Sequence, residues 1–224
     1  MFSLARKILN DLANYAALIV EASSPEDRAA IVLYVMSSPI RLFYKIIGRE
    51  HPRTFIRNIT LRNSDGLFFC GKSLVSCRIA CTRYEEDLKD CFNLSKGVFV
   101  DIGSHIGKYA IRVAKNLGDN GKVVAIEPDP TNFSILKRNV QLNHLTNVHL
   151  ENVACSDHDG WVSFYLNTRY STQHSLFVNA GQGSLTVKAV SLDTILANLK
   201  IGKVDLIKID AEAAEIDILR GAMR

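Results

Sequence analysis

The stretch Val98-Phe-Val-Asp-Ile-Gly-Ser-His-Ile-Gly-Lys-Tyr109 decides the fold of this chain. Its first three residues are apolar and predict a buried strand. An acid follows at Asp101, then two glycines at Gly103 and Gly107, and a helical pattern begins at Tyr109. A strand, a glycine turn and a helix in this order build a ligand site in α/β proteins, because the turn lets a ligand approach the backbone and the helix offers free N–H groups.

The spacing within this turn narrows the class of ligand. The dinucleotide fingerprint G-x-G-x-x-G would need a glycine where Asp101 stands, so a nicotinamide-dependent dehydrogenase is disfavoured. The pattern is instead D-x-G-x-x-x-G, and the next apolar run ends in a second acid, Glu127. This arrangement resembles the S-adenosylmethionine site of Rossmann-like methyltransferases, where the carboxylate of Asp101 could meet the methionine ammonium. A structural glycine turn in another α/β domain is the alternative that this motif alone leaves open.

Composition sets further bounds. The chain has 224 residues, of which 47% are hydrophobic and 22% charged, as in soluble globular proteins. Its net charge of +4 is spread along the sequence and is too small to indicate a nucleic-acid partner. Five irregularly spaced cysteines favour free thiols in a reducing compartment, so we expect a cytoplasmic protein without a metal cluster. No signal peptide or membrane-spanning run is evident.

Pattern divides the chain into three predicted segments. These are a helical extension at 1–53, a β-hairpin and helical segment at 54–96, and the main domain at 97–224. In the main domain, strands are predicted at 98–102, 122–127, 147–153 and 204–209, and helices at 107–117, 130–143, 191–199 and 216–220. This alternation predicts an α/β fold with a Rossmann-like, doubly wound and mainly parallel sheet.

The N-terminal segments carry their own signals. Three helices are predicted at 2–22, 25–37 and 40–47, and Asn63-Ser-Asp-Gly66 predicts a hairpin turn between two strand-like runs. The helices either pack on a domain or lie on a membrane surface or partner. The second alternative arises because basic residues flank the apolar side chains of the third helix, namely Arg41, Lys45 and Arg49.

Three motifs in the main domain match one family. Val100–Gly107 looks like V-D-[IV]-G-A-N-x-G, Ala125–Phe133 looks like A-[FI]-E-P-x-P-x-N-[FY], and Asp205–Glu215 looks like D-[LF]-[IL]-K-I-D-[VA]-E-G-x-E. From about residue 54 onward the chain therefore resembles the FkbM-type S-adenosylmethionine-dependent methyltransferases. Tyr84-Glu85 also resembles the segment that precedes the first strand in that family.

The resemblance implies S-adenosylmethionine as cofactor and assigns residues to it. Glu127 would accept hydrogen bonds from the ribose hydroxyls. Asn152 and Ala154 would lie along the adenine, or alternatively only pack at a strand end, and Asp157 would reach the adenine amine or cap a turn. The other expected cofactor-binding residues are Glu85, Asp101, Gly103, Ser104, His105, Gly107, Pro128 and Asn132.

The expected reaction is methylation of a hydroxyl group on a sugar or another small molecule, as the resemblance implies. Asp210 and Glu212 follow the fourth strand and could take the proton of that hydroxyl, or they could anchor the cofactor and cap the last helix. His174, in a long polar loop, is a weaker candidate base. Two positions depart from the family pattern: His105 replaces an asparagine and Ala213 replaces a glycine.

The sheet of the family has seven strands, whereas four are predicted here before Arg224. The sequence therefore predicts that the last strands are missing and that the fourth strand is an uncovered edge. A second copy of the chain in a homo-oligomer, or another partner, is expected to cover it. The alternative function is an inactive or partner-dependent cofactor-binding fragment.

Overall fold

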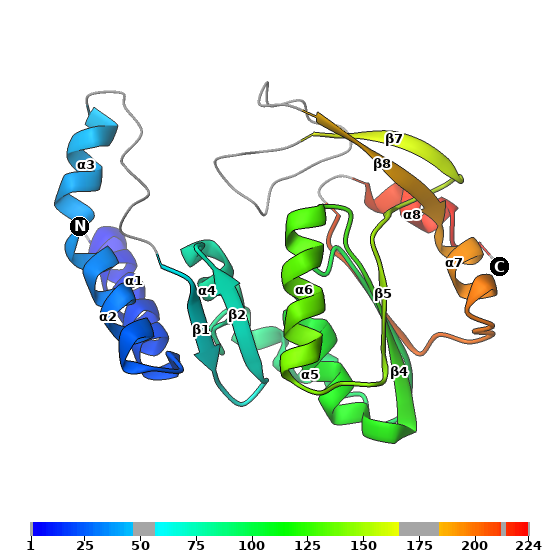
Figure 1. Ribbon diagram of the computed structural model, residues 1–224, viewed down its shortest axis with the longest axis horizontal. Coiled ribbons are helices and arrows are strands. Elements are labelled where there is room, and N and C mark those ends of the chain that lie inside the picture. The colour runs from blue at the N-terminus through cyan, green and yellow to red at the C-terminus, as the bar shows by residue number, and fades with distance from the viewer. Residues whose placement is uncertain (1, 47–56, 166–183, 212–213, 224) are drawn as a thin grey trace. The chain divides into compact units, whose positions relative to one another are not determined.

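The computed structural model describes residues 2–46, 57–165, 184–211 and 214–223. Contacts within it divide the chain into two compact units, Met1–Asp87 and Leu88–Arg224 (Figure 1). The boundary between the units lies inside the segment 54–96 that the sequence analysis set apart.

The first unit contains the predicted helices and hairpin. Its elements are α1 (Phe2–Glu21), α2 (Pro25–Met36), α3 (Ser38–Ile46), β1 (Ile59–Arg62), β2 (Leu67–Gly71) and α4 (Leu74–Ala80). Ser24 caps α2 by accepting the N–H of Asp27 at 3.1 Å, and Pro25 occupies the first turn. The carboxylate of Asp27 also accepts the N–H of Thr60 at 3.2 Å, which ties the start of α2 to the hairpin.

A buried carboxylate joins α1 to the rest of the first unit. Glu21 accepts hydrogen bonds from the Asn63 amide at 2.7 Å, from the Thr82 N–H at 3.2 Å and from the Thr82 hydroxyl. Charge-assisted bonds of this kind offset the cost of burying the carboxylate. The bond from Asn63 to Glu21 also supports the hairpin turn, because the amide oxygen of Asn63 accepts the N–H groups of Asp65 and Gly66 within that turn.

Apolar side chains remain exposed on the second and third helices. Met36, Phe43 and Ile46 are 71%, 59% and 74% exposed. None of the helices in the described residues is long and apolar enough to span a bilayer. Contact of this helical face with a membrane surface therefore stays a prediction.

The main sheet lies in the second unit and is parallel, as predicted. Its strands are β3 (Gly97–Ile102), β4 (Gly121–Ile126), β5 (Val148–Glu151) and β9 (Leu206–Ile209), in the order β5-β4-β3-β9. Within the described part of the chain, β9 pairs with β3 alone. Coverage of its other edge by a second copy stays a prediction.

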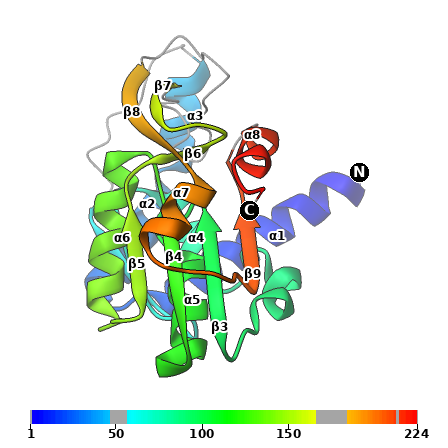
Figure 2. The same ribbon diagram turned by 90° about the vertical axis from the view of Figure 1, so that its right-hand side faces the viewer.

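Helices cover both faces of this sheet, which makes it doubly wound (Figure 2). These helices are α5 (Lys108–Leu117), α6 (Pro130–Leu142), α7 (Leu192–Asn198) and α8 (Glu215–Arg220). Inward residues of β3 and β4 pack with Leu192 and Ile195 of α7 and Ile218 of α8 in one buried cluster. In Figure 2, α5 lies behind the sheet and α7 in front of it. The predicted Rossmann-like α/β fold is confirmed.

Two elements differ from the sequence-based predictions. A single strand was expected at 147–153, but β5 ends at Glu151 and the chain continues into β6 (Ala154–Ser156) of a separate sheet. That sheet also contains β7 (Gly160–Tyr165) and β8 (Ser184–Ser191), in the order β6-β8-β7. The second difference lies before β3. The helical pattern there predicts an α-helix, whereas residues Glu86–Phe92 form the 3-10 helix η2. A short 3-10 turn, η3 (Gly118–Asn120), precedes β4.

All five cysteines are free thiols, as predicted. Cys70, Cys77, Cys81 and Cys155 are buried, and Cys91 is exposed. Burial raises the pKa of Cys155 to about 12, so this thiol stays protonated at neutral pH.

Candidate cofactor site

The turn after β3 requires glycine at Gly103. Its φ is +77°, and a Cβ atom there would lie 1.9 Å from the carbonyl oxygen of Asp210. The Asp210 N–H donates to the carbonyl of Ile102 at 3.0 Å, so the ends of β3 and β9 are in direct backbone contact. Any side chain at Gly103 would force these two strand ends apart.

The same turn is anchored to the end of β4. The N–H groups of Gly103 and Ser104 both donate to the carbonyl of Ile126 at 3.0 Å. The Ser104 hydroxyl donates to the carbonyl of Asp101 at 2.7 Å. Gly107 precedes α5 with φ +91°, and a Cβ there would lie 2.5 Å from a methyl group of Leu136 on α6. The turn is thus fixed by β4 on one side and by α6 on the other.

Glu127 follows β4 and joins the first two sequence motifs. One of its oxygens accepts the N–H of His105 at 2.8 Å, and the other accepts the N–H of Asp129 at 3.0 Å. His105 has φ +50°, which turns its N–H toward this carboxylate. Asp129 in turn caps α6 by accepting the N–H of Asn132 at 2.8 Å. The structure therefore brings His105, Glu127 and Asn132 together, and their contact with the cofactor stays a prediction.

The carboxyl group of Glu127 is in an unusual electrostatic environment. Its residue is 5% exposed, and burial raises its pKa to about 7, although the N–H groups of His105 and Asp129 favour the ionised form. Each oxygen accepts one backbone N–H, and the side chain of Asn132 also donates to the carboxylate. Of its roughly four acceptor positions, one is left for a hydrogen bond from a ligand.

This raised pKa predicts a pH dependence of stability. The folded state binds a proton at Glu127 up to about pH 7, whereas an ordinary glutamate loses it near 4.5. Stability therefore falls as pH rises from about 4.5 to 7, by roughly 3 kcal/mol, and stays level above that window. The Glu127→Gln variant should lack this component in urea denaturation curves. If the free energy of unfolding changed equally with pH in the Glu127→Gln variant and in the unaltered chain between about pH 5 and 7, the assignment of this effect to Glu127 would be wrong.

Asp101 and Asp210 are connected by a lysine that the sequence analysis did not single out. Asp101 is fully buried on β3, and its register partner on β9 is Lys208. The ammonium of Lys208 lies 3.2 Å from Asp101 Oδ1 and 3.7 Å from Asp210 Oδ2. The sequence did contain a signal for this contact. Lys208 and Asp210 are two residues apart at the end of a predicted strand, and residues with that spacing share a face.

The residues predicted to lie along the adenine, Asn152, Ala154 and Asp157, follow the end of β5. The Asn152 amide donates to the carbonyls of Glu127 at 2.7 Å and Pro128 at 3.2 Å. Ala154 is buried in β6. Asp157 is exposed and contacts His158 Nδ1 at 2.5 Å, a hydrogen bond that lowers the pKa of Asp157. Contact of these residues with adenine stays a prediction.

The side chain of Asn152 thus helps to shape the site by binding the backbone carbonyls of Glu127 and Pro128. By holding the segment after β4, the Asn152 amide also fixes the point where the chain leaves the main sheet. Glu212, Ala213 and His174 lie outside the described residues. Within the described ranges, no group of three metal-ligating side chains occurs.

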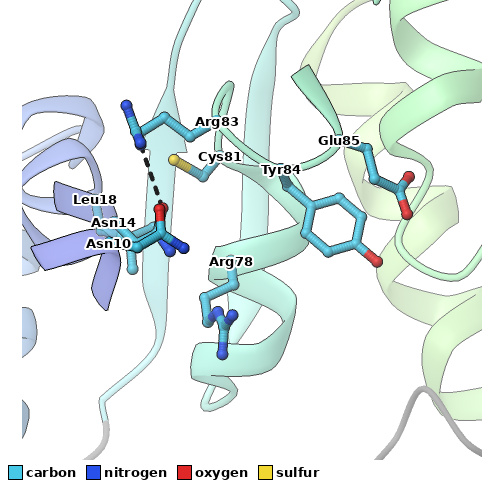
Figure 3. Close-up of a pocket in the computed structure, with 8 residues that line it drawn as sticks. All are labelled: Asn10, Asn14, Leu18, Arg78, Cys81, Arg83, Tyr84 and Glu85. Carbon is cyan, nitrogen blue, oxygen red and sulfur yellow. Dashed lines mark hydrogen bonds between the residues drawn. The ribbon is translucent and has the colours of Figure 1, made fainter. Parts of the chain in front are cut away.

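Glu85 belongs to the first unit and lines a pocket of about 180 Å³ there (Figure 3). Its backbone has φ +50°. The pocket is lined by Asn10, Asn14, Leu18, Arg78, Cys81, Arg83, Tyr84 and Glu85. The Arg83 side chain donates from Nε to the side-chain amide oxygen Oδ1 of Asn14 at 3.2 Å. In Figure 3 the Arg83 side chain points away from Arg78. The predicted contact of Glu85 with the cofactor stays a prediction.

Comparison with known families decides how this site is interpreted. The family profile described as "Methyltransferase FkbM domain" matches residues 101–224, which is more than half of the chain. The chain belongs to the FkbM methyltransferase family. The matched range includes the glycine turn, Glu127 and the segment after β9.

Two curated methyltransferases are similar to part of this chain. The hexuronic acid methyltransferase AglP of Haloferax volcanii is 28% identical over 125 residues, which cover 55% of this chain and 49% of that protein. Methyltransferase 1 of Beauveria bassiana is 23% identical over 144 residues, covering 54% and 57%. The chain therefore spans about half the length of the curated relatives it matches.

Solved structures give weaker similarities. The FkbM methyltransferase from Methylobacillus flagellatus is 15% identical with a TM-score of 0.38, over 97% of this chain and 45% of that one. TYW2 from M. jannaschii, solved in complex with AdoMet, is 26% identical with a TM-score of 0.34, over 46% and 48%.

Proposed function

We propose that this member of the FkbM family binds S-adenosylmethionine and methylates a hydroxyl group of a small molecule, with a sugar as the favoured acceptor. The observation that carries the proposal is the buried Glu127 carboxylate, held by the N–H of His105 beside the glycine turn. Family membership supports the reaction class. The similarity to a hexuronic acid methyltransferase supports a sugar acceptor.

The residues present fit the adenosine part of this cofactor. Glu127 has an acceptor position left for a ribose hydroxyl, because its oxygens receive two backbone N–H groups and the side chain of Asn132. Gly103 and Gly107 let the turn pack closely against the end of β9 and against α6, which fixes its position beside Glu127. The dinucleotide fingerprint would instead need a glycine where Asp101 stands.

The chemistry divides between cofactor and protein. S-adenosylmethionine supplies a methyl group activated by its sulfonium. The chain orients the two reactants and excludes water, which is the larger part of catalysis in such displacements. A carboxylate after β9 then takes the acceptor's proton, and Asp210 and Glu212 are the candidates. Asp210 has the required access, because its side chain is 66% exposed.

A methyl-transfer assay tests the proposal. The chain is incubated with radiolabelled S-adenosylmethionine and a panel of acceptors that includes neutral sugars, hexuronic acids and simple polyols. We expect labelled product from at least one carbohydrate, and loss of that product in the Glu127→Ala variant. Transfer to a protein or nucleic acid in the same panel, with none to any carbohydrate, would contradict the proposed acceptor class.

A further inference from the structure

Lys208 lies where three parts of the site meet. In the parallel pair of β3 and β9, Lys208 is opposite Asp101, so the two side chains share a face of the sheet. The ammonium of Lys208 is 3.2 Å from Asp101 Oδ1, 3.4 Å from the Gly103 carbonyl oxygen and 3.7 Å from Asp210 Oδ2. It also lies 5.3 Å from the centre of the Tyr109 ring. One cation thus joins the buried strand, the glycine turn and the end of β9.

Burial separates the roles of the two carboxylates. Asp101 is fully buried, and no hydrogen bond reaches either of its carboxylate oxygens from the described residues. The ion pair with Lys208 is therefore what balances this charge, since a lone buried carboxylate is strongly destabilising. The side chains of Lys208 and Asp210 are 13% and 66% exposed, so both lie closer to solvent than Asp101.

We infer that Lys208 and Asp210 bind the amino-acid end of the cofactor, with Asp101 beneath them as the counter-ion that positions Lys208. This inference rests on the proposed function. The methionine end carries a carboxylate, which suits the ammonium of Lys208, and an ammonium, which suits the carboxylate of Asp210. The three side chains together carry a charge of −1, which complements the net +1 of S-adenosylmethionine.

The inference reassigns one predicted contact and one predicted role. The methionine ammonium was expected to meet Asp101, but Lys208 lies against that carboxylate in the structure. The exposed Asp210 is then the carboxylate that the ammonium would meet. With Asp210 bound to the cofactor, Glu212 is the other candidate base named above that can take the acceptor's proton.

Two ligands that differ in the amino-acid end separate this role from a structural one. S-adenosylhomocysteine has that end, and 5′-methylthioadenosine lacks it. Calorimetric titration of the Asp210→Asn variant should show a loss of affinity of about tenfold or more for S-adenosylhomocysteine, as for one charge-assisted bond. Its affinity for 5′-methylthioadenosine should stay within about twofold of the unaltered chain, because that ligand makes no contact with Asp210.

Lys208 is best tested together with its buried partner. The double variant Asp101→Asn/Lys208→Met removes both charges, so that no lone charge is left buried. We expect the same selective loss for S-adenosylhomocysteine, with a circular dichroism spectrum like that of the unaltered chain. Lys203→Met is the matched control, because Lys203 is 82% exposed and pairs with Asp205. It should change neither affinity.

Three outcomes would overturn the inference. The first is an equal loss for both ligands, which would make the cluster a structural support. The second is an unchanged affinity for S-adenosylhomocysteine in both variants. The third is an Asp210→Asn variant that binds S-adenosylhomocysteine normally but transfers methyl groups slowly, which would make Asp210 the base. By contrast, an unaltered chain that binds neither ligand would overturn the proposed function itself.

Discussion

Replacing Glu127 with alanine is expected to reduce affinity for S-adenosylhomocysteine at least about a hundredfold, which is effectively a loss of binding. The change removes the charge-assisted acceptor for a ribose hydroxyl, worth about 1.5–3 kcal/mol. It also leaves the N–H groups of His105 and Asp129 without the carboxylate that now accepts them. The turn would then lose one of its links to the end of β4, while the hydrogen bonds of Gly103 and Ser104 to Ile126 remain. Calorimetric titration measures the effect.

Two further variants make this result specific to Glu127. Glu151 ends the neighbouring strand β5, and its side chain pairs with His149 at the surface. Glu151→Ala should therefore bind as the unaltered chain does. Glu127→Gln keeps the shape of the side chain but has one acceptor oxygen, so we expect intermediate affinity. Retained affinity in Glu127→Ala would show that the ligand lies elsewhere.

The second large effect is expected for Gly103→Ala. A Cβ atom at this position would lie 1.9 Å from the Asp210 carbonyl oxygen, and the φ of +77° is unfavourable for alanine. Backbone, not a flexible side chain, is the obstacle, so β3 and β9 must separate. We expect a loss of more than about 3 kcal/mol in the free energy of unfolding, measured with urea.

Gly202→Ala provides the control for that substitution. Gly202 lies in the same unit, and nothing lies within 4 Å of the Cβ that alanine would add. Its unfolding free energy should stay within about 0.5 kcal/mol of the unaltered chain. If Gly103→Ala were as stable as Gly202→Ala, the contact between the turn and the β9 end would not exist in solution.

Much of the fold could be predicted because local signals and tertiary contacts agree. The apolar run before Asp101 and the Glu-Pro step after β4 mark two neighbouring parallel strands, and the carboxyl ends of such strands meet at one edge of the sheet. Gly103 and Gly107 also predicted the tight turn between the strand and the helix, because only a few backbone geometries require glycine. His105, Glu127 and Asn132 were predicted among the cofactor-binding residues because they belong to the first two motifs, and the structure places them beside one another.

Other features depend on contacts between distant residues and leave little trace in the sequence. The break between β5 and β6 is set by the Asn152 amide reaching back to the segment after β4. An asparagine between two apolar runs gives no sign of that contact. The place of Lys208 opposite Asp101 follows from the register of β3 and β9, which are 107 residues apart along the chain at the Val98–Asp205 contact. Register of this kind is a tertiary property.

Titration of the chain with S-adenosylhomocysteine, with NAD as the control ligand, tests the central claim most directly. The buried Glu127 beside the glycine turn predicts saturable binding of S-adenosylhomocysteine. No binding of NAD is expected, because Asp101 stands where the dinucleotide fingerprint needs a glycine. A folded chain, as judged by circular dichroism, that bound NAD or bound neither ligand would contradict the account.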